Sequence, residues 1–484
     1  MIAKKRILFI IPLVLTFIVY FNVIKGDFVW DDQTIVVRNE AVKGFKNIPY
    51  IFKNEFAEMA NYNGNVYRPM QELSYMADYW LWGMDSRGFH FTSILLQLIC
   101  VALLFYLVRA ITQSGIIALI SSVIFGLHPV NTEAIAYISG RSDPLYLLFM
   151  LSSFLLYVKS RNPGVLKKTI YYISSLIFYA GSLISRETAI CFPLLLIAYG
   201  GFAREDRRTD WLSIIPFGAI VAAYAFFRLN VIEFNQAAIG VLNVNAIIFT
   251  DIKIIFNYLI LLIFPLNLHM ERVMALSTTL DADAFLGLIV ILPLIIFSLK
   301  LKKRSPRIFF WILWFFILLL PHLNILRLNA MYAEHWIYGA AIGIYVIIAY
   351  AIEGLYRNKK VQKAVLNLLC AGIVLYLASI SIARNNDWKD EPSIYTSTLK
   401  HNDSARVWSN LGVYYDINEE YANAIEAYKE ALRVSPRDTL YNNNIAIVYM
   451  KTGKMEKAVY HWGFSLKVNP NQPKVREFLS KYKI

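Results

Sequence analysis

Two adjacent carboxylates, Asp31 and Asp32, have the residue types and the position of a reactive centre. They follow an apolar run that ends near Ile24, where a membrane-spanning helix would leave the membrane. Neighbouring carboxylates repel each other and shift each other's pKa, which suits a general base or a divalent-cation site. Two ordinary loop acids that cap a short helix starting near Gln33 would give the same pattern. Because ionisable residues close to the membrane are often functional, we treat the pair as a candidate catalytic centre.

Arginine and acidic side chains recur in later connections that we expect on the same membrane face, Arg327 among them. A guanidinium group presents paired donors and binds phosphate well, so a carboxylate pair facing arginines indicates a phosphorylated substrate. Taken singly, each of these residues is more often an interfacial anchor or a helix cap. The candidate ligands of the phosphate are Arg68, Arg141, Arg186 and Arg272. The further site candidates are His128, Glu133, Asp143, Glu187, Glu334 and His335.

The expected substrate is a sugar carried on a lipid phosphate. Soluble nucleotide sugars are normally absent outside the cytoplasm, whereas a lipid-linked phosphosugar is available there and lies close to the membrane. In the hypothesised reaction, Asp31 or Asp32 takes the proton from an acceptor hydroxyl, and the lipid phosphate leaves the anomeric carbon. The sequence contains no nucleotide-binding glycine loop, Ser/His/Asp series or His/Cys cluster that would compete with this assignment.

The composition places these residues in a membrane protein. The chain has 484 residues, of which 57% are hydrophobic and 17% charged, and this is too apolar for one soluble core. The net charge of +14 does not indicate a nucleic-acid partner, because lysine and arginine form short clusters between apolar runs. The three cysteines lie in apolar stretches without the spacing of a disulfide framework or a zinc site.

Eleven apolar runs predict a polytopic helical bundle over residues 1–384, with a long first outer loop at 25–90. No small-residue cleavage site follows the first run, so we expect a retained signal anchor with a cytoplasmic N-terminus. Basic clusters fall in every second connection, as the positive-inside rule requires. This count requires that 236–268 is a re-entrant or interfacial helix. The other ten runs lie at about 91–108, 115–130, 144–158, 170–185, 189–203, 211–227, 284–299, 308–321, 337–355 and 364–383.

Internal repetition predicts a tetratricopeptide-repeat domain at 385–484, on the extracytoplasmic side. Similar residues recur 34 positions apart, for example Gly412 and Ala446, over repeats at about 407–440 and 441–474. Flanking helices near 391–401 and 473–482 are expected to cap these two repeats. The domain either covers the outer loops or binds an acceptor peptide, and the sequence favours neither. The residues that would line its groove are Asn410, Tyr415 and Asn444.

The order of these motifs resembles the transmembrane and tetratricopeptide-repeat O-mannosyltransferases. The resemblance rests on Phe28–Asp32, Tyr67–Met70, His128–Asp143, Ala333-Glu334 and the trailing repeats. It implies the GT-C fold of the polyprenol-dependent glycosyltransferases, an inverting transfer from a polyprenyl-phosphate sugar such as mannose, and a protein Ser/Thr hydroxyl as acceptor. It also implies that the acidic pair is catalytic. The sequence departs from the family at His335, where an arginine is expected.

Two other functions are compatible with the sequence. A non-catalytic membrane scaffold could display the repeat domain to assemble an envelope or secretory complex. A transporter of lipid-linked glycans would need charged residues within the spans, and the spans are nearly free of them. Because no retention signal ends the chain, a prokaryotic cytoplasmic membrane is favoured over the endoplasmic reticulum. A divalent cation would be compatible with the acidic pair, but no cofactor is predicted besides the lipid-linked donor.

Overall fold

The computed structural model describes residues 2–60, 62, 66–161, 167–206, 208–231, 243–272, 274, 276–324 and 330–481. These residues form helices joined by turns and loops, without a strand among them. Arg327 lies outside the described residues, and so does the first part of the 236–268 stretch. Contacts divide the chain into one unit of residues 1–268 and 273–388 and a second unit of His269–Arg272 and Lys389–Ile484.

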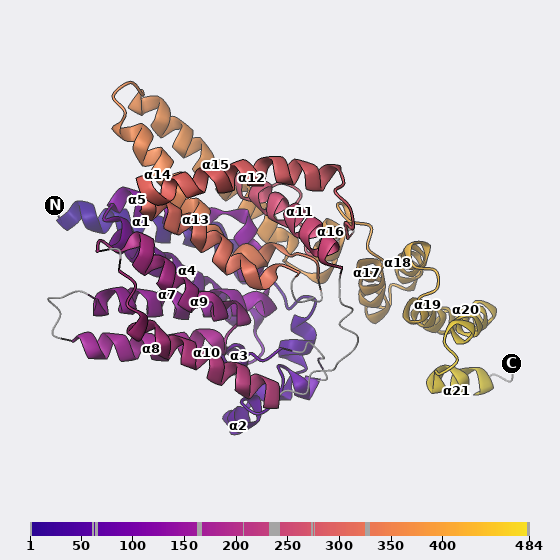
Figure 1. Cartoon of the computed structure of the whole chain (residues 1–484). Coiled ribbons are helices and arrows are strands. Elements are labelled where there is room, and N and C mark those ends of the chain that lie inside the picture. The colour runs from indigo at the N-terminus through magenta and orange to yellow at the C-terminus, as the bar shows by residue number, and fades with distance from the viewer. Residues whose placement is uncertain are drawn as a thin grey trace. The chain divides into compact units, whose positions relative to one another are not determined.

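The first unit is a bundle of long helices (Figure 1). Every apolar run predicted from the sequence is helical in the structure. The helices of the bundle are α1 (Ile2–Tyr20), α4 (Ser86–Thr112), α5 (Gly115–Leu127), α7 (Ser142–Ser160), α8 (Lys168–Leu183), α9 (Phe192–Ala198), α10 (Trp211–Val231), α11 (Val244–Ile263), α12 (Ala282–Arg304), α13 (Pro306–Leu319), α14 (Ala341–Arg357) and α15 (Lys363–Asp387).

Six helices of the described chain are long and apolar enough to cross a membrane, and a seventh span arises if α5 and the bent segment Pro129–Ala136 count as one. The predicted number of eleven crossings is therefore larger than length and composition support. Of the predicted spans, α8, α9, α13 and α14 contain only 16, 7, 14 and 17 residues, and α7 has 19 residues but is not among the six. Helix α11, which was predicted not to cross, is among them. Large apolar side chains remain exposed along α12, as expected of a surface that faces lipid. The chain is an all-helical, multi-pass integral membrane protein.

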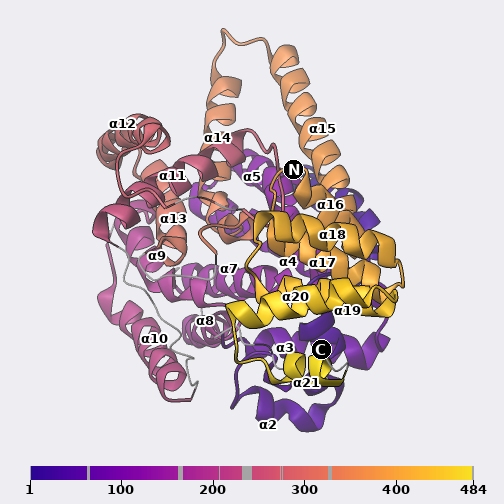
Figure 2. The ribbon, with the colours of Figure 1, turned by 90° about the vertical axis from the view of Figure 1, so that its right-hand side faces the viewer.

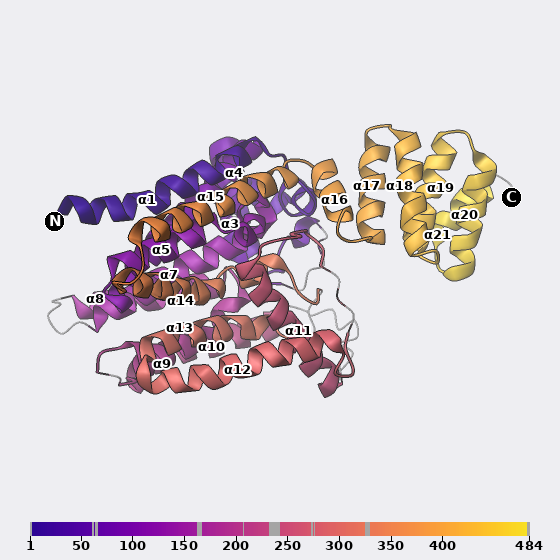
Figure 3. The ribbon, with the colours of Figure 1, turned by 90° about the horizontal axis from the view of Figure 1, so that it is seen from above.

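One end of the bundle collects connections that carry the basic clusters, and we call it the basic end. Gln113, in the turn after α4, donates a hydrogen bond of 2.6 Å to Glu205. The neighbouring Ser114 donates one of 2.6 Å to Glu353 near the end of α14. Figure 3 shows α1, α5 and α14 running from this end along the bundle. Connections that are distant in the sequence therefore meet here, in agreement with the alternation of basic clusters.

The opposite end, the polar end, holds the first loop and the short helices α2 (Ile48–Ile51) and α3 (Pro69–Trp82). Its interior is a cluster of buried apolar side chains that includes Val36, Phe56 and Phe89. Glu72 of α3 accepts hydrogen bonds from the Asn39 side chain and the Ala57 backbone, at 3.0 and 3.1 Å. These contacts fold the loop back onto the bundle.

Helix α11 contacts connections of the polar end. Asp251 accepts a hydrogen bond of 2.8 Å from Asn324. Tyr258 donates one of 3.0 Å to the carbonyl of Ala333. Asp251 and Tyr258 lie only seven positions apart, about 10 Å along the helix axis, so both contacts fall in the middle of the helix. Helix α11 is long and apolar enough to span, so its length and composition do not support the predicted non-crossing segment.

The second unit contains paired helices that stack in order (Figure 2). Gly412 lies where α17 meets α18, and a Cβ atom there would lie 2.8 Å from the Tyr428 ring. Small residues therefore occur at the helix contact, as the repeat pattern predicts, and helices flank the two pairs at the expected positions. The helices are α16 (Glu391–Leu399), α17 (Ala405–Ile417), α18 (Tyr421–Val434), α19 (Thr439–Lys451), α20 (Met455–Val468) and α21 (Pro473–Lys481).

Candidate active site

The two adjacent carboxylates have different surroundings. The Asp32 side chain is fully buried, and its oxygens accept hydrogen bonds from the Val29 amide at 3.1 Å and the Ser139 amide at 2.7 Å. The Ser139 hydroxyl donates a further, short hydrogen bond to Asp32. Asp31 is only partly buried. Asp32 thus fastens the first loop to the segment around Ser139, while part of Asp31 reaches the surface.

Burial raises the pKa of Asp32 to about 7, against the lowering effect of the Ser139 and Val29 hydrogen bonds and with a further increase from the Asp31 charge. Burial and the charges of Asp31 and Asp32 also raise the pKa of Tyr137. The Tyr137 ring stacks on Trp388 with a centroid distance of 5.0 Å. An aromatic pair therefore lies within the electrostatic reach of the acidic pair.

Arg68 is joined to two other charged residues in the same unit. Its Nη2 lies 3.1 Å from Oε2 of Glu187, and Nη1 of Arg228 lies 3.1 Å from the other Glu187 oxygen. Burial would raise the pKa of Glu187, but the two arginines lower it to about 2, so this carboxylate is ionised. One carboxylate against two guanidinium groups leaves a net positive charge.

Arg186 extends this arrangement through Ser142 and Asp143. Its Nη1 donates to Oδ2 of Asp143 at 2.7 Å and to the Ser142 hydroxyl at 2.9 Å. The same hydroxyl lies 3.5 Å from Nη1 of Arg68. The structure therefore brings Arg68, the residue before α3, and Arg186, in the connection between α8 and α9, together around one serine. We call Arg68, Arg186, Arg228 and Glu187 the arginine cluster.

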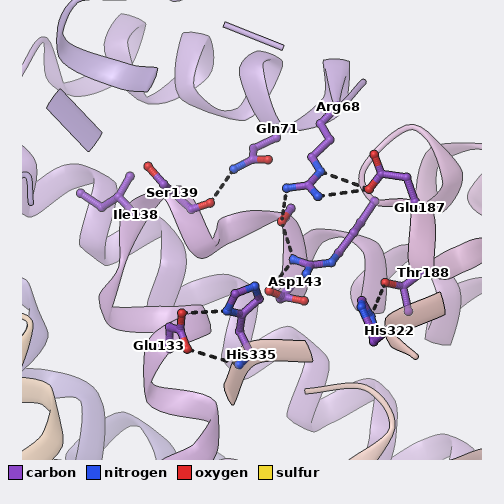
Figure 4. Close-up of polar contacts among 12 residues, drawn as sticks. Arg68, Gln71, Glu133, Ile138, Ser139, Asp143, Glu187, Thr188, His322 and His335 are labelled. Atoms are coloured by element: carbon purple, nitrogen blue, oxygen red, sulfur yellow. Dashed lines mark hydrogen bonds and ion pairs between the residues drawn. The ribbon is translucent and has the colours of Figure 1, made fainter. Parts of the chain in front are cut away.

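A histidine and a glutamate form the neighbouring contact in Figure 4. Nδ1 of His335 lies 2.7 Å from Oε1 of Glu133, and the His335 amide donates to the other oxygen at 3.3 Å. His322 contacts Thr188 nearby, with 3.0 Å between Nε2 and the hydroxyl oxygen. The predicted candidates Glu133 and His335 are thus direct partners.

Gln71 contacts the segment that holds Asp32. Its amide nitrogen donates a hydrogen bond of 2.8 Å to the carbonyl of Ser139, whose amide and hydroxyl hold Asp32. Gln71 lies on α3, three residues after Arg68. Figure 4 shows Gln71 projecting towards Ser139 and Arg68 towards Glu187. Helix α3 and the residue before it therefore contribute both to the segment that holds Asp32 and to the arginine cluster.

Three predicted candidates are buried in contacts of their own. The Arg141 guanidinium is fully buried, forms an ion pair of 2.5 Å with Asp78, and donates to the Phe89 carbonyl at 2.7 Å. His128 is buried, with Nε2 at 3.2 Å from the Leu262 carbonyl. Glu334 is 1% exposed and lies 3.6 Å from Arg384. These contacts hold elements of the first unit together.

The remaining candidates belong to the second unit. Arg272 is in the short segment whose Glu271 accepts hydrogen bonds from Ser404 at 3.1 Å and Arg406 at 3.4 Å. Arg272 therefore belongs to the same unit as the repeats. In the repeats, Tyr415 packs against the apolar core and is half-buried. Asn410 and Asn444 are half-buried as well.

Sequence reasoning missed several residues of the site. Ser139 and Ser142 lie within the His128–Asp143 motif but were not singled out, and Arg228 lies in a helix without a motif; their roles depend on contacts across the chain. The signal for Arg228 was a charge that directly follows the apolar run 211–227 in the same helix. Among the described residues, no group of three or more His, Cys, Asp or Glu side chains could hold a metal ion.

Comparison with known proteins adds a family context. The tetratricopeptide repeat model matches residues 405–438, which confirms a repeat of this type. Protein O-mannosyl-transferase F38B6.6 of Caenorhabditis elegans is 26% identical over 439 residues, covering 85% of this chain and 61% of the relative. Protein O-mannosyl-transferase TMTC3 of Homo sapiens is 23% identical over 91% of this chain and 52% of its own length. The chain resembles the protein O-mannosyl-transferases. It thereby bears out the family resemblance predicted from the motifs, while spanning about half to three fifths of the length of these relatives.

Solved structures also align with most of the chain. The alignment with ArnT from Cupriavidus metallidurans, bound to undecaprenyl phosphate, includes 95% of this chain and 75% of the ArnT chain. The sequence identity is 11% and the TM-score is 0.42. The alignment with the Archaeoglobus fulgidus oligosaccharyltransferase, tethered with an acceptor peptide, includes 87% of this chain and 58% of that enzyme. The sequence identity is 10% and the TM-score is 0.43.

Proposed function

We propose that the protein is a GT-C glycosyltransferase that moves mannose or another hexose from a polyprenyl phosphate to a protein Ser/Thr hydroxyl. The observation that carries this proposal is that α3 serves both the acidic pair and the arginine cluster. Its Gln71 bonds Ser139, which holds Asp32 next to the partly exposed Asp31, and Arg68 of the arginine cluster immediately precedes the helix. A base and a phosphate site in one polar region are what glycosyl transfer from a lipid phosphate requires. The similarity to protein O-mannosyl-transferases supports the same chemistry.

In the proposed reaction, Asp31 accepts the proton of the acceptor hydroxyl while the hydroxyl oxygen attacks the anomeric carbon. The bond from that carbon to the phosphate oxygen breaks, and its electron pair stays on the lipid phosphate. Attack opposite the leaving group inverts the anomeric configuration. Asp32 acts as a positioning residue, because its oxygens are occupied by Val29 and Ser139.

Arg68 and Arg186 are the proposed ligands of the donor phosphate. Each uses part of its guanidinium group on Ser142 and on a carboxylate, Glu187 or Asp143. A guanidinium has five N–H donors, so each arginine retains donors for a phosphate. The leaving phosphate would thus gain charge-assisted hydrogen bonds as negative charge develops.

The proposed topology places the polar end and the repeats outside the cytoplasm and the basic end inside. The positive-inside rule supports this orientation. The repeat unit would then present acceptor proteins on the side where Asp31 lies, and its tetratricopeptide match is in keeping with peptide binding.

Purified protein in proteoliposomes tests the proposal. With radiolabelled polyprenyl-phosphate mannose and an acceptor protein, wild type is expected to transfer label, and Asp31→Asn is expected to lose it by at least about a hundredfold, as for removal of a general base. Full activity of both Asp31→Asn and Asp32→Asn would rule out the mechanism.

A further inference from the structure

The basic end contains two adjoining cavities that the proposed glycosyl transfer does not use. The first has a volume of about 600 Å³ and the second about 460 Å³. Both are lined by Gln113, Ser114 and Arg357, so they share a wall formed by the α4–α5 turn and the end of α14. Volumes of this size are typical of pockets that hold small molecules.

Arginines from four different parts of the chain surround these cavities. Arg204 and Arg307 line the first cavity, Arg109 lines the second, and Arg357 lines both. The acidic residues of the two linings are Glu205 and Glu353. Cations therefore outnumber carboxylates, and they come from α4, α13, α14 and the segment after α9.

Carboxylates offset part of this positive charge, and Arg204 is paired with Asp206 at 2.8 Å. Glu353 accepts a hydrogen bond of 2.6 Å from Ser114 and lies 3.2 Å from Arg357. Glu205 accepts a bond of 2.6 Å from Gln113 and lies 3.9 Å from Arg307, which is beyond hydrogen-bond distance. Among the ion pairs of the described residues, none includes Arg109.

Apolar side chains form the remaining walls. Ile117, Phe202 and Ile308 line the first cavity, and Leu8 and Phe105 line the second. An arginine-lined cavity with apolar walls between the ends of membrane helices matches an anionic headgroup attached to acyl chains. A soluble anion would satisfy the arginines but leave the apolar walls without a partner.

We propose that these cavities bind an anionic glycerophospholipid, with its phosphate against Arg109 and Arg357 and its acyl chains along the apolar walls. The site is separate from the candidate active site, because it lies at the opposite end of the bundle. It would hold the α4–α5 turn to α14 in the membrane. The proposal stands whether or not the protein transfers sugar.

The test measures lipid binding to the full-length protein in detergent, by native mass spectrometry and by the shift of the thermal unfolding midpoint. Dioleoylphosphatidylglycerol is compared with dioleoylphosphatidylcholine and with inorganic phosphate. For wild type, phosphatidylglycerol is expected to stay bound and to raise the midpoint, with at least fivefold higher affinity than phosphatidylcholine. Equal effects of the two lipids, or an equal effect of inorganic phosphate alone, would overturn the proposal.

Arg109→Gln/Arg357→Gln is expected to weaken phosphatidylglycerol binding at least fivefold. The matched control is Lys300→Gln/Lys303→Gln, which removes the same charge from two exposed residues near the end of α12 that line neither cavity. Its binding is expected to equal that of wild type. Equal losses in both variants would show a diffuse charge effect and contradict the site.

A filling variant keeps the test decisive if removal of the arginines prevents folding. Gly354 lines the first cavity, and a Cβ atom on it would meet nothing within 4 Å. Gly354→Phe therefore adds a ring to the cavity without removing any charge. Loss of bound phosphatidylglycerol in this variant supports the proposal, whereas unchanged binding in a folded Gly354→Phe protein contradicts it.

Discussion

At the scale of single residues, the acidic pair shows how identical side chains acquire different roles. Asp32 is buried and accepts hydrogen bonds from two backbone amides, whereas Asp31 is partly exposed. The sequence identified the pair but could not separate its members, because the difference arises from Ser139, more than a hundred positions away. Arg141 was likewise recognisable as an arginine, but its burial against Asp78 depends on how α3 packs.

The raised pKa of Asp32 predicts how stability changes with pH. Its folded-state pKa of about 7 lies above the unfolded value of 3.8, so the folded state binds the proton more tightly. The stabilising contribution is complete below about pH 4 and is lost as the pH rises through about 7. Wild type is therefore expected to lose several degrees of unfolding midpoint, relative to Asp32→Asn, between pH 5 and pH 8. Thermal unfolding of both proteins across this range measures the difference, and parallel curves would contradict it.

Arg68 and Arg228 allow a matched comparison, since both contact Glu187 at 3.1 Å but only Arg68 also reaches Ser142. Arg68→Lys keeps the charge but removes the planar donor fork that suits phosphate. We expect the KM for the polyprenyl-phosphate donor to rise at least tenfold, with a smaller change in kcat. Arg228→Lys should change the KM less than threefold. Steady-state transfer assays distinguish the two variants, and equal effects would indicate that the arginines act only as structural partners of Glu187.

At the scale of helices, periodicity and spacing in the sequence predicted where most helices occur. They did not predict how long each helix is or which helices and connections contact one another. The 34-residue spacing identified the repeat helices and the position of Gly412. By contrast, the run at 308–321 forms the 14-residue helix α13, which is shorter than a typical membrane crossing. The contacts of α11 with Asn324 and Ala333 also join segments that no local pattern relates.

Gly412 and Gly463 predict different effects of the same substitution in the repeat unit. A Cβ atom at Gly412 would lie 2.8 Å from Tyr428, whereas one at Gly463 in α20 would meet nothing within 4 Å. Gly412→Val is therefore expected to destabilise the unit by about 1–3 kcal/mol through overpacking. Gly463→Val should have little effect. Limited proteolysis of the full chain in increasing urea measures both, and equal resistance of the two variants would contradict the packing.

At the scale of the whole molecule, composition and basic clusters were sufficient to predict a multi-pass membrane protein with a repeat unit. They could not reveal that Arg68 and Arg186 meet around Ser142, since that contact joins three separated parts of the chain. Nor could they show that Glu271 packs with the repeats through Arg406, because one short segment of the 264–281 connection joins the second unit.

The proposed topology predicts that Lys303 and the exposed Arg437 of the repeat unit lie on opposite sides of the membrane. Single cysteines at these positions, in a variant lacking the three native cysteines, should react with an impermeant maleimide from opposite sides of oriented vesicles. Labelling of both from the same side would show that the number of crossings between them is even. It would contradict the proposal that the repeat unit presents acceptors outside the cytoplasm.

The central claim is that the lipid phosphate binds at the arginine cluster, facing Asp31. An experimental structure of the protein with a bound polyprenyl phosphate tests it most directly. The account predicts the phosphate within hydrogen-bond distance of Arg68 or Arg186, with the Asp31 carboxylate open to the position of the sugar. A phosphate bound away from both arginines, with Arg68 still fully engaged by Glu187, would contradict the account.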